Sequence, residues 1–285
     1  KSHHMTPLKI VTGPSGCGKT QLCIMLSVLA TLPRSMGGLD SGVIFMTQSR
    51  LIDMAQARFP EFFSVKERLL EMTSRVLLFR ELACQDVLNR LEHFPNTYTY
   101  LGSGLLILDS VASVVRKEFD TSLPGNLTFR SNLLGQEAAV LKYLSMFPFC
   151  LPQVVLTNQI TTHVGEKVHC PQWNQADVSS EEDSGFVTAA LGNTWSHCVN
   201  TRLIVQYEDT ERRQLNTLLL CIVITKSPMA PFAMLSYTVQ SEGIRLEGNE
   251  NPESVLNQGT DPGLQPIRVR TGFIYNLSQA TPSTW

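Results

Sequence analysis

Hydrophobic runs separated by glycine, proline and polar residues divide this chain into predicted strands and helices. Short, almost wholly apolar runs predict buried strands, and longer stretches with apolar residues three and four positions apart predict amphipathic helices. The predicted strands are residues 8–12, 42–46, 76–79, 105–109, 153–157, 186–191, 201–207, 218–225 and 232–239. The predicted helices are residues 21–32, 50–59, 65–72, 84–94 and 132–147. Strands and helices therefore alternate in the first half, and strands dominate the second.

This order predicts an α/β fold with a largely parallel, twisted sheet flanked by helices and with antiparallel strands added toward the C-terminus. Residues 105–108 are apolar on both faces, which is typical of a central parallel strand. We expect one domain over residues 6–247. Residues 1–5 are expected to be a tag remnant, and residues 248–285, with several prolines and glycines, an irregular tail.

Composition and charge narrow the class of protein. With 43% hydrophobic and 17% charged residues, the chain of 285 residues has an ordinary globular composition. A net charge of −2 gives no general attraction to polyanions, so any contact with nucleic acid must be local. Seven scattered cysteines without a C-x-x-C pair favour reduced thiols, and no apolar run approaches the roughly 18 to 20 residues of a membrane helix. We expect a soluble intracellular protein.

Residues 11–20, Val-Thr-Gly-Pro-Ser-Gly-Cys-Gly-Lys-Thr, contain the pattern G-x-x-x-x-G-K-T. Such a loop turns its backbone N–H groups onto phosphates at the start of a helix, and the alternative is a plain glycine turn before a core helix. Because a strand precedes it and a helix follows, we predict an ATP site. Lys19 would neutralise phosphate charge and Thr20 would bind Mg²⁺. The predicted cradle consists of Gly13, Pro14, Ser15, Gly16, Cys17, Gly18, Lys19 and Thr20.

Two further polar residues follow predicted buried strands. Asp109 ends the strand at residues 105–109 and is predicted to join Thr20 at the Mg²⁺ ion, although a helix cap or a turn is the alternative. Gln159 follows the strand at residues 153–157. Its amide both donates and accepts hydrogen bonds, so it is predicted to sense the γ-phosphate or orient water, or else simply to form a turn.

Residues 160–186 are polar and show no clear period. A loop of this length in a compact domain is usually functional or disordered. His163, His169 and Cys170 suggest zinc there, but no fourth ligand stands at suitable spacing. Trp173 is predicted to stack on a nucleic-acid base or to fill a crevice.

Four elements in fixed order, GPSGCGKT (13–20), LLILDS (105–110), LTNQ (156–159) and TKSPMAPF (225–232), resemble the RecA/Rad strand-exchange recombinase family. Three longer stretches, residues 109–120, 157–163 and 189–203, look specifically like the B group of its eukaryotic paralogues. The resemblance covers about residues 8–247. It implies a RecA-like P-loop ATP-binding core, a site completed by a neighbouring subunit, and a role in homologous-recombination repair of DNA.

The resemblance also assigns residues by position. Arg50 would stack on adenine, and Lys226 and Pro228 belong to a segment that caps ATP across a subunit boundary. A first DNA loop would include Arg116, Lys117 and Arg130; a second, residues 160–186, would include Thr161 and Trp173. From the residues alone, a single basic pair such as Arg116 and Lys117 is more typical of a solvated surface than of a phosphate contact. The implied partners are other recombinase paralogues, foremost a C-type one, and single-stranded and branched DNA, with no membrane, in the nucleus.

The chain departs from the family pattern in three places. Where the family carries a glutamate that activates the attacking water, this chain has Gln48, which can position water but cannot take its proton. Residues 215–221 look inserted before the strand that ends at Lys226, and the family's small N-terminal domain is missing from the chain. Hydrolysis is therefore expected to be slow.

Three functions fit these patterns. The first is a weak, DNA-stimulated ATPase that assists recombinase filaments on single-stranded DNA. The second is a non-catalytic scaffold in which ATP stabilises a subunit interface, since ligand binding stabilises the folded state. The third, which the paralogue-like stretches disfavour, is a ring-forming, helicase-like ATPase.

Overall fold

The computed structural model describes residues 8–46, 50–101, 103–119, 125–145, 153–163, 186–189, 191, 195, 198–208 and 219–247. Within these ranges the chain forms a nine-stranded sheet in the order β11-β10-β9-β8-β1-β5-β4-β2-β3 and a separate two-stranded sheet, β6-β7. The strands are β1 (Lys9–Thr12), β2 (Gly42–Met46), β3 (Val76–Phe79), β4 (Ser103–Leu108), β5 (Gln153–Asn158), β6 (Ile160–His163), β7 (Phe186–Ala189), β8 (Thr201–Tyr207), β9 (Leu220–Lys226), β10 (Ala233–Gln240) and β11 (Gly243–Leu246).

The pairing of the strands confirms the predicted mixed sheet. β3, β2, β4, β5, β1 and β8 pair in parallel in that spatial order. β9, β10 and β11 then extend the sheet in antiparallel fashion. β4 lies between two parallel neighbours, as its apolar run predicts. The carboxyl ends of β1, β4 and β5 therefore meet at one edge, where ligands bind in open α/β sheets.

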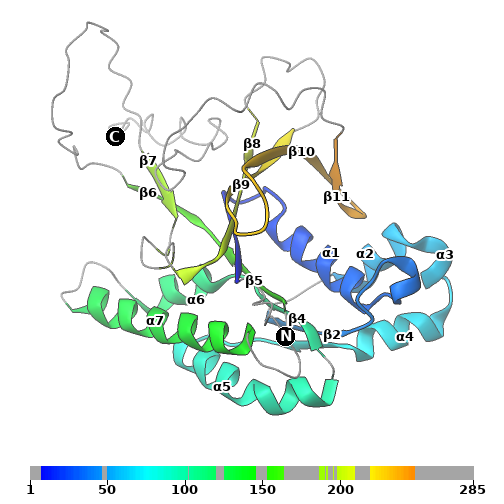
Figure 1. Ribbon diagram of the computed structural model, residues 1–285, viewed down its shortest axis with the longest axis horizontal. Helices are drawn as coiled ribbons and strands as arrows, with labels where there is room; N and C mark the ends of the chain where they lie inside the picture. The colour runs from blue at the N-terminus through cyan, green and yellow to red at the C-terminus, as the bar shows by residue number, and fades with distance from the viewer. Residues whose placement is uncertain are drawn as a thin grey trace, which may run out of the picture.

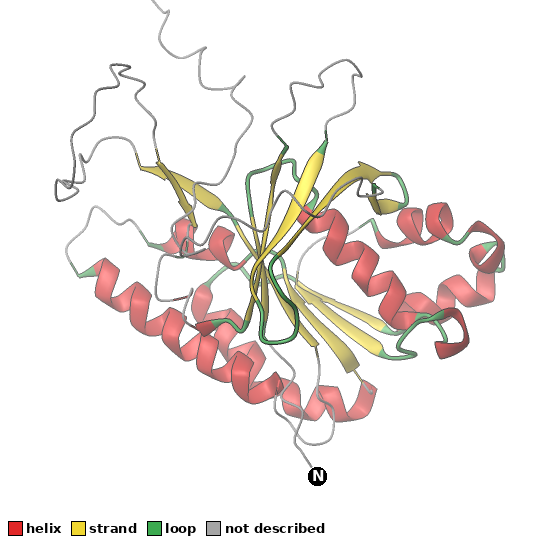
Figure 2. Ribbon diagram, turned by 45° about the horizontal axis from the view of Figure 1, so that its top comes forward, coloured by secondary structure: helices red, strands yellow, loops and turns green. Residues whose placement is uncertain are grey.

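Helices cover both faces of this sheet (Figures 1 and 2). They are α1 (Lys19–Thr31), the 3-10 turn η1 (Arg34–Met36), α2 (Leu51–Arg58), α3 (Pro60–Phe63), α4 (Lys66–Ser74), α5 (Cys84–Leu101), α6 (Val111–Glu118) and α7 (Asn126–Ser145). In Figure 1, α1 to α4 lie on one side of the sheet and α5 to α7 on the other. None of the helices in the described residues is long and apolar enough to span a membrane.

Each face of the sheet has its own hydrophobic core. One combines Val11, Phe45 and Ile107 with residues of α1 and α2. The other combines Ile44 and Leu106 with side chains of α5, α6 and α7 and with Trp195, which is 2% exposed. The alternation of buried side chains along the central strands thus fixes both helical layers against one sheet.

Several elements differ from the sequence-based prediction. α6 was not predicted, because its valines favour strands; in the structure Ser110 caps it by accepting a hydrogen bond from the Ser113 N–H. α7 begins at Asn126 instead of residue 132, and the two large apolar side chains of its first turn, Leu127 and Phe129, are exposed. Residues 160–163 and 186–189, predicted in part as an aperiodic loop, pair as β6 and β7. Arg116 and Lys117, expected in a loop, lie in the last turn of α6, and Arg130 lies in α7.

Candidate nucleotide site

The loop between β1 and α1 has the backbone that a phosphate cradle requires. Gly16 and Gly18 adopt φ values of 85° and 74°, in the left-handed region that glycine tolerates best. A Cβ atom on Gly13 would lie 2.1 Å from the carbonyl oxygen of Val205, so β8 presses directly against the loop. The glycines of the motif are therefore needed for curvature and for close packing.

Lys19 points into this loop. Its Nζ donates to the carbonyl oxygens of Gly13 at 2.8 Å and of Pro14 at 2.6 Å. Burial lowers the pKa of the Lys19 ammonium, while the nearby Cys17 and Asp109 act in the opposite direction. The side chain is thus poised at the loop, where a phosphate would replace carbonyl oxygens as its acceptor.

Asp109 joins three segments that are far apart in the sequence. Thr20, at the start of α1, donates from Oγ1 to Asp109 Oδ2 at 2.6 Å. Thr157, near the end of β5, donates from Oγ1 to Asp109 Oδ1 at 2.5 Å. The predicted neighbourhood of Thr20 and Asp109 is therefore present. Thr157, which is fully buried, was missed by the sequence analysis; the only sequence signal is a polar residue at the end of an apolar strand.

These residues suit ATP and Mg²⁺. Mg²⁺ prefers hard oxygen ligands and keeps most of its waters, so one hydroxyl and one carboxylate are a sufficient protein contribution. The Thr20 hydroxyl and the Asp109 carboxylate already share one location at the mouth of a glycine loop. When bound, the ion would offset the negative charge of the phosphates.

Gln159 lies at the junction of β5 and β6 and is held by Arg116. The guanidinium of Arg116 donates from Nη1 to Gln159 Oε1 at 3.0 Å and from Nη2 to the carbonyl oxygen of Ile160 at 2.6 Å. A residue predicted to sense phosphate and a residue assigned to DNA by resemblance are therefore in direct contact. The sequence analysis gave no reason to expect this pair.

Two tyrosines brace the phosphate loop from the C-terminal strands. The Tyr237 hydroxyl of β10 donates to the Cys17 carbonyl oxygen at 2.7 Å, in a fully buried contact. The Tyr207 hydroxyl of β8 donates to the Ser15 carbonyl oxygen at 3.2 Å at a more exposed position. Periodicity cannot reveal such contacts, because they depend on which strands lie beside β1.

The remaining predicted site residues lie farther out. Arg50 is exposed at the start of α2. Lys226 ends β9, where its Nζ donates to the Val199 carbonyl oxygen at 2.8 Å, and Pro228 follows in an exposed turn. Thr161 lies in β6. Gln48, His169, Cys170 and Trp173 lie outside the described residues.

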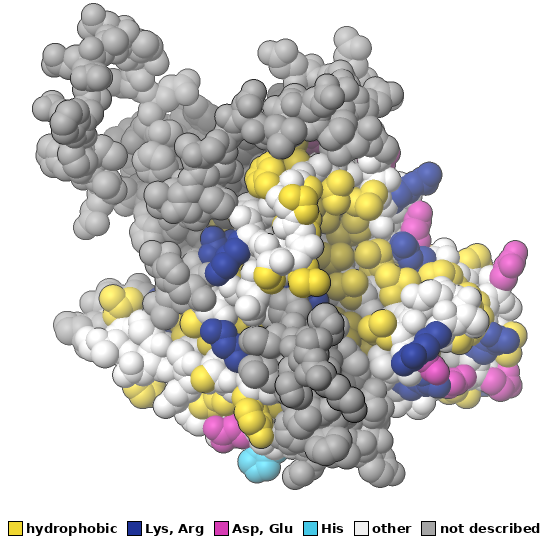
Figure 3. Space-filling model, viewed as in Figure 1, with side chains coloured by type: hydrophobic (Ala, Val, Ile, Leu, Met, Phe, Trp, Pro, Cys, Tyr) yellow, Lys and Arg dark blue, Asp and Glu magenta, His cyan; other side chains and the backbone are white. Residues whose placement is uncertain are grey.

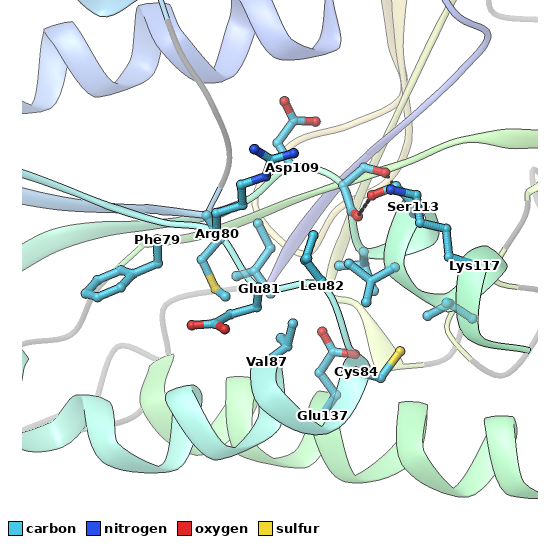
Figure 4. Close-up of a pocket in the computed structure, with 16 residues that line it drawn as sticks. Phe79, Arg80, Glu81, Leu82, Cys84, Val87, Asp109, Ser113, Lys117 and Glu137 are labelled. Carbon is cyan, nitrogen blue, oxygen red and sulfur yellow. Dashed lines mark hydrogen bonds between the residues drawn. The ribbon is translucent and has the colours of Figure 1, made fainter.

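A cavity of about 210 Å³ borders Asp109 and is lined by residues of α5, α6 and α7 (Figure 4). Glu137 of α7 and Cys84 of α5 lie close together in it, facing Val87, and Ser113 and Lys117 enter from α6. Glu137 is 4% exposed, and this burial raises the pKa of its carboxyl group to about 8. Within the described residues, no group of three or more His, Cys, Asp or Glu side chains is arranged to hold a metal.

Comparison with known proteins decides the family. The family model described as Rad51 matches residues 5–246. This chain belongs to the Rad51 family. It is 49% identical over 258 residues to the mouse DNA repair protein RAD51 homolog 2, and 50% identical over 253 residues to the human protein of that name. It is 29% identical over 273 residues to the Arabidopsis thaliana RAD51 homolog 2.

The alignments include most of this chain but a smaller share of each relative. The alignment with the mouse protein includes 85% of this chain and 70% of the mouse protein; with the human protein the shares are 83% and 62%. The predicted resemblance to the B group is confirmed by this similarity. The chain spans less than two thirds of its human relative, so the activities of the whole protein enter only as proposals.

Proposed function

We propose that this Rad51-family chain binds ATP with Mg²⁺ and assists homologous-recombination repair as a recombinase paralogue. The observation that carries the proposal is the convergence of Lys19, Thr20 and Asp109 at the curved glycine loop. Loop N–H groups and the start of α1 would bind the phosphates, and Lys19 would leave its loop carbonyls to neutralise them. Thr20 and Asp109 would hold the ion. Arg50 is proposed to stack on the adenine, and Lys226 and Pro228 to cap ATP across a subunit boundary.

Hydrolysis is proposed to be slow. Gln48 stands where a carboxylate is expected, and an amide can orient water without accepting its proton. Gln159 is proposed to contact the γ-phosphate, because it follows β5 only two residues after Thr157, which contacts Asp109. A weak ATPase is the favoured form, and a nucleotide-dependent scaffold is the alternative that Gln48 supports.

DNA contact is proposed at the last turn of α6 and the adjoining part of α7. Arg116, Lys117 and Arg130 bring positive charge together there, and the proposed second DNA segment contributes Thr161 and Trp173. On the face of the molecule that Figure 3 shows, the Lys and Arg side chains of the described residues lie in separate groups. Phosphate binding would therefore be local. The proposed partners are other recombinase paralogues, foremost a C-type one, and single-stranded and branched DNA in the nucleus, where the chain would promote recombinase filaments.

ATP binding is tested by Lys19→Ala, with Lys66→Ala at an exposed position of α4 as the matched control. Loss of charge-assisted hydrogen bonds should weaken binding of a fluorescent, non-hydrolysable ATP analogue by about 10- to 100-fold. Lys66→Ala should bind as the parent does. Equal affinity in the Lys19→Ala and parent proteins would refute the nucleotide site.

ATP turnover with Mg²⁺, measured with and without single-stranded DNA, separates the two forms of the proposal. Turnover that DNA increases supports the weak ATPase. Tight binding of the analogue without turnover supports the scaffold. A sixfold ring in native mass measurement would instead favour a helicase-like motor.

A further inference from the structure

The cavity beside Asp109 has room for a small organic molecule. Its volume is about 210 Å³, and an engineered apolar cavity of about 150 Å³ already binds benzene. Its apolar walls include Phe79, Leu82 and Val87, which would pack against an apolar ring. The glycine loop, whose residues 13–20 are all described, contributes no residue to the lining. The cavity is therefore distinct from the phosphate cradle.

Glu137 occupies a core position of α7. It lies one turn after Leu133 and Leu134 and one turn before Leu141, and all three leucines are buried. An apolar residue at this position would avoid the cost of burying a carboxyl group. Glu137 is only 4% exposed, and its side chain takes part in no hydrogen bond or ion pair within the described part of the chain. A buried carboxyl group without a partner indicates a site for a ligand that supplies one.

The Glu137 carboxyl group faces the cavity. Figure 4 shows it directed toward Leu82, with Val87 and Cys84 on either side. An ionised carboxyl group only accepts hydrogen bonds, so its partner must supply N–H donors. A planar amidinium presents two parallel donors to the two carboxylate oxygens, and an ammonium presents three donors. The cavity therefore suits a positively charged donor on an apolar body.

The charged groups at the mouth of the cavity are consistent with this preference. Arg80 and Lys117 line the cavity but are exposed, so water and salt weaken their repulsion of a cation. Glu81 and Asp109 bring negative charge to the same cavity. An anion would instead face the buried carboxyl group of Glu137 in surroundings that screen their repulsion poorly.

We propose that this cavity binds a small organic cation, an amidinium or ammonium on a compact apolar body, and that the Glu137 carboxylate is its anchor. Phe79, Val87 and Val114 would contact the apolar body. Burial raises the pKa of Glu137 to about 8, so a cation that binds near pH 7 displaces the proton of this carboxyl group to solvent. The cation site would be a second site, independent of the function proposed above.

Benzamidine and benzamide test the cation site by calorimetric titration of the parent chain. The two molecules have nearly the same size and shape, but only benzamidine is a cation near pH 7. We expect benzamidine to bind saturably and at least about 10-fold more tightly than benzamide, because only the cation pairs with the Glu137 carboxylate. An excess of the non-hydrolysable ATP analogue should not displace benzamidine.

Glu137→Gln keeps the shape of the side chain and removes its charge. Affinity for benzamidine should fall by about 10-fold or more, whereas affinity for benzamide should change by less than about threefold. Glu92→Gln, the same substitution at an exposed position of α5, is the matched control and should bind both molecules as the parent does. Unfolding in denaturant verifies that each variant is folded.

Proton release is a second readout, which a merely structural role of Glu137 would not affect. Titrations near pH 7 in two buffers with different enthalpies of ionisation should show about one proton released per benzamidine bound by the parent, and none by Glu137→Gln. The other titratable or charged groups around this carboxyl group are Cys84 of α5, Lys117 and Glu118 of α6, Arg130 of α7, and Arg80, Glu81 and Asp109 at the mouth. All of them are present in both proteins, so the comparison cancels their titration.

The outcomes separate the cation site from the proposed function. The cation site would be overturned by absence of saturable benzamidine binding, by equal affinity for benzamidine and benzamide, or by parent-like binding of benzamidine to Glu137→Gln. Displacement of benzamidine by the ATP analogue would also overturn it, because the probe would then lie in the nucleotide site. Failure of the parent to bind the ATP analogue, with benzamidine bound as expected, would overturn the proposed function alone.

Discussion

Asp109 shows how much of the site depends on single hydrogen bonds. Both of its carboxylate oxygens accept from threonine hydroxyls, one from the phosphate loop side and one from β5. The Thr157 hydroxyl fixes the rotation of the Asp109 carboxylate. A carboxylate held from both sides is preorganised to share an ion with Thr20.

The role of Thr157 predicts the effect of removing its hydroxyl. Thr157→Val keeps the shape of the buried side chain but leaves Asp109 Oδ1 without that donor. We expect the Mg²⁺-dependent affinity for the ATP analogue to fall by about 3- to 10-fold, measured by titration at several Mg²⁺ concentrations. Thr157→Ser, which restores the hydroxyl, should recover most of the affinity. Parent-like binding by Thr157→Val would contradict the role assigned to this hydroxyl.

At the level of single residues, the sequence predicted Lys19, Thr20 and Asp109 because each belongs to a local pattern: a glycine loop or the end of an apolar strand. Thr157 and the bond from Arg116 to Gln159 were not predictable in this way. Their contacts depend on β5 lying between β1 and β4 and on α6 lying against β5, which no local pattern contains.

At the level of elements, the phosphate loop is supported by strands that come much later in the chain. β8 packs against Gly13, and β10 supplies the buried Tyr237 hydroxyl that bonds the Cys17 carbonyl. The parallel strand β8 and the antiparallel strand β10 therefore both support the glycine loop from outside it.

This support predicts a cost for Tyr237→Phe. The substitution leaves the buried Cys17 carbonyl without its donor, so the free energy of unfolding should fall by about 1 to 3 kcal/mol. Chemical denaturation measures this loss, and the variant should also bind the ATP analogue more weakly. Tyr207→Phe, whose contact with Ser15 is more exposed, should cost less than Tyr237→Phe. If both variants lost the same free energy of unfolding, the burial of the Tyr237 contact with Cys17 would not determine its contribution to stability.

The sequence predicted the elements whose apolar residues follow a clear strand or helix pattern. It did not predict elements whose residue types favour a different secondary structure. The apolar strands, including β3 and β8, occur where the pattern places them, because burial on the sheet requires that pattern. α6 was hidden by β-branched valines, and tertiary packing overrode that preference. β7 was predicted as part of a strand over residues 186–191, whereas its partner β6 was not, because the two strands pair across a long intervening segment and no turn signal marks β6.

At the level of the whole molecule, the folding free energy is coupled to a proton on Glu137. Its pKa is raised from 4.5 to about 8 because the carboxyl is buried against α5 and α6. Between these two pH values the folded protein keeps the proton that the unfolded chain has lost. The folded state therefore binds more protons, and this contribution to stability falls as pH rises from about 4.5 to 8.

Glu137→Gln should remove this pH dependence, because an amide has a similar shape but does not titrate. We expect the stability of the parent relative to that of the variant to fall by about 3 to 5 kcal/mol between the two ends of that pH range, as unfolding in denaturant would measure. The comparison cancels the titration of all other groups. A parent and a variant with parallel pH profiles would show that Glu137 ionises normally in the folded state.

The central place of β1 in the sheet also sets the order in which the molecule is completed during translation. β1 pairs with β5 at residues 155–158 and with β8 at residues 201–204. A ribosome adds about 5 to 20 residues per second, so the segment that carries the phosphate loop waits many seconds for both neighbours. The β2, β3 and β4 pairings are available much sooner. β1 is thus synthesised before β2, β3 and β4 but paired after them, and the packing of Val205 against Gly13 is not available until β8 has been synthesised.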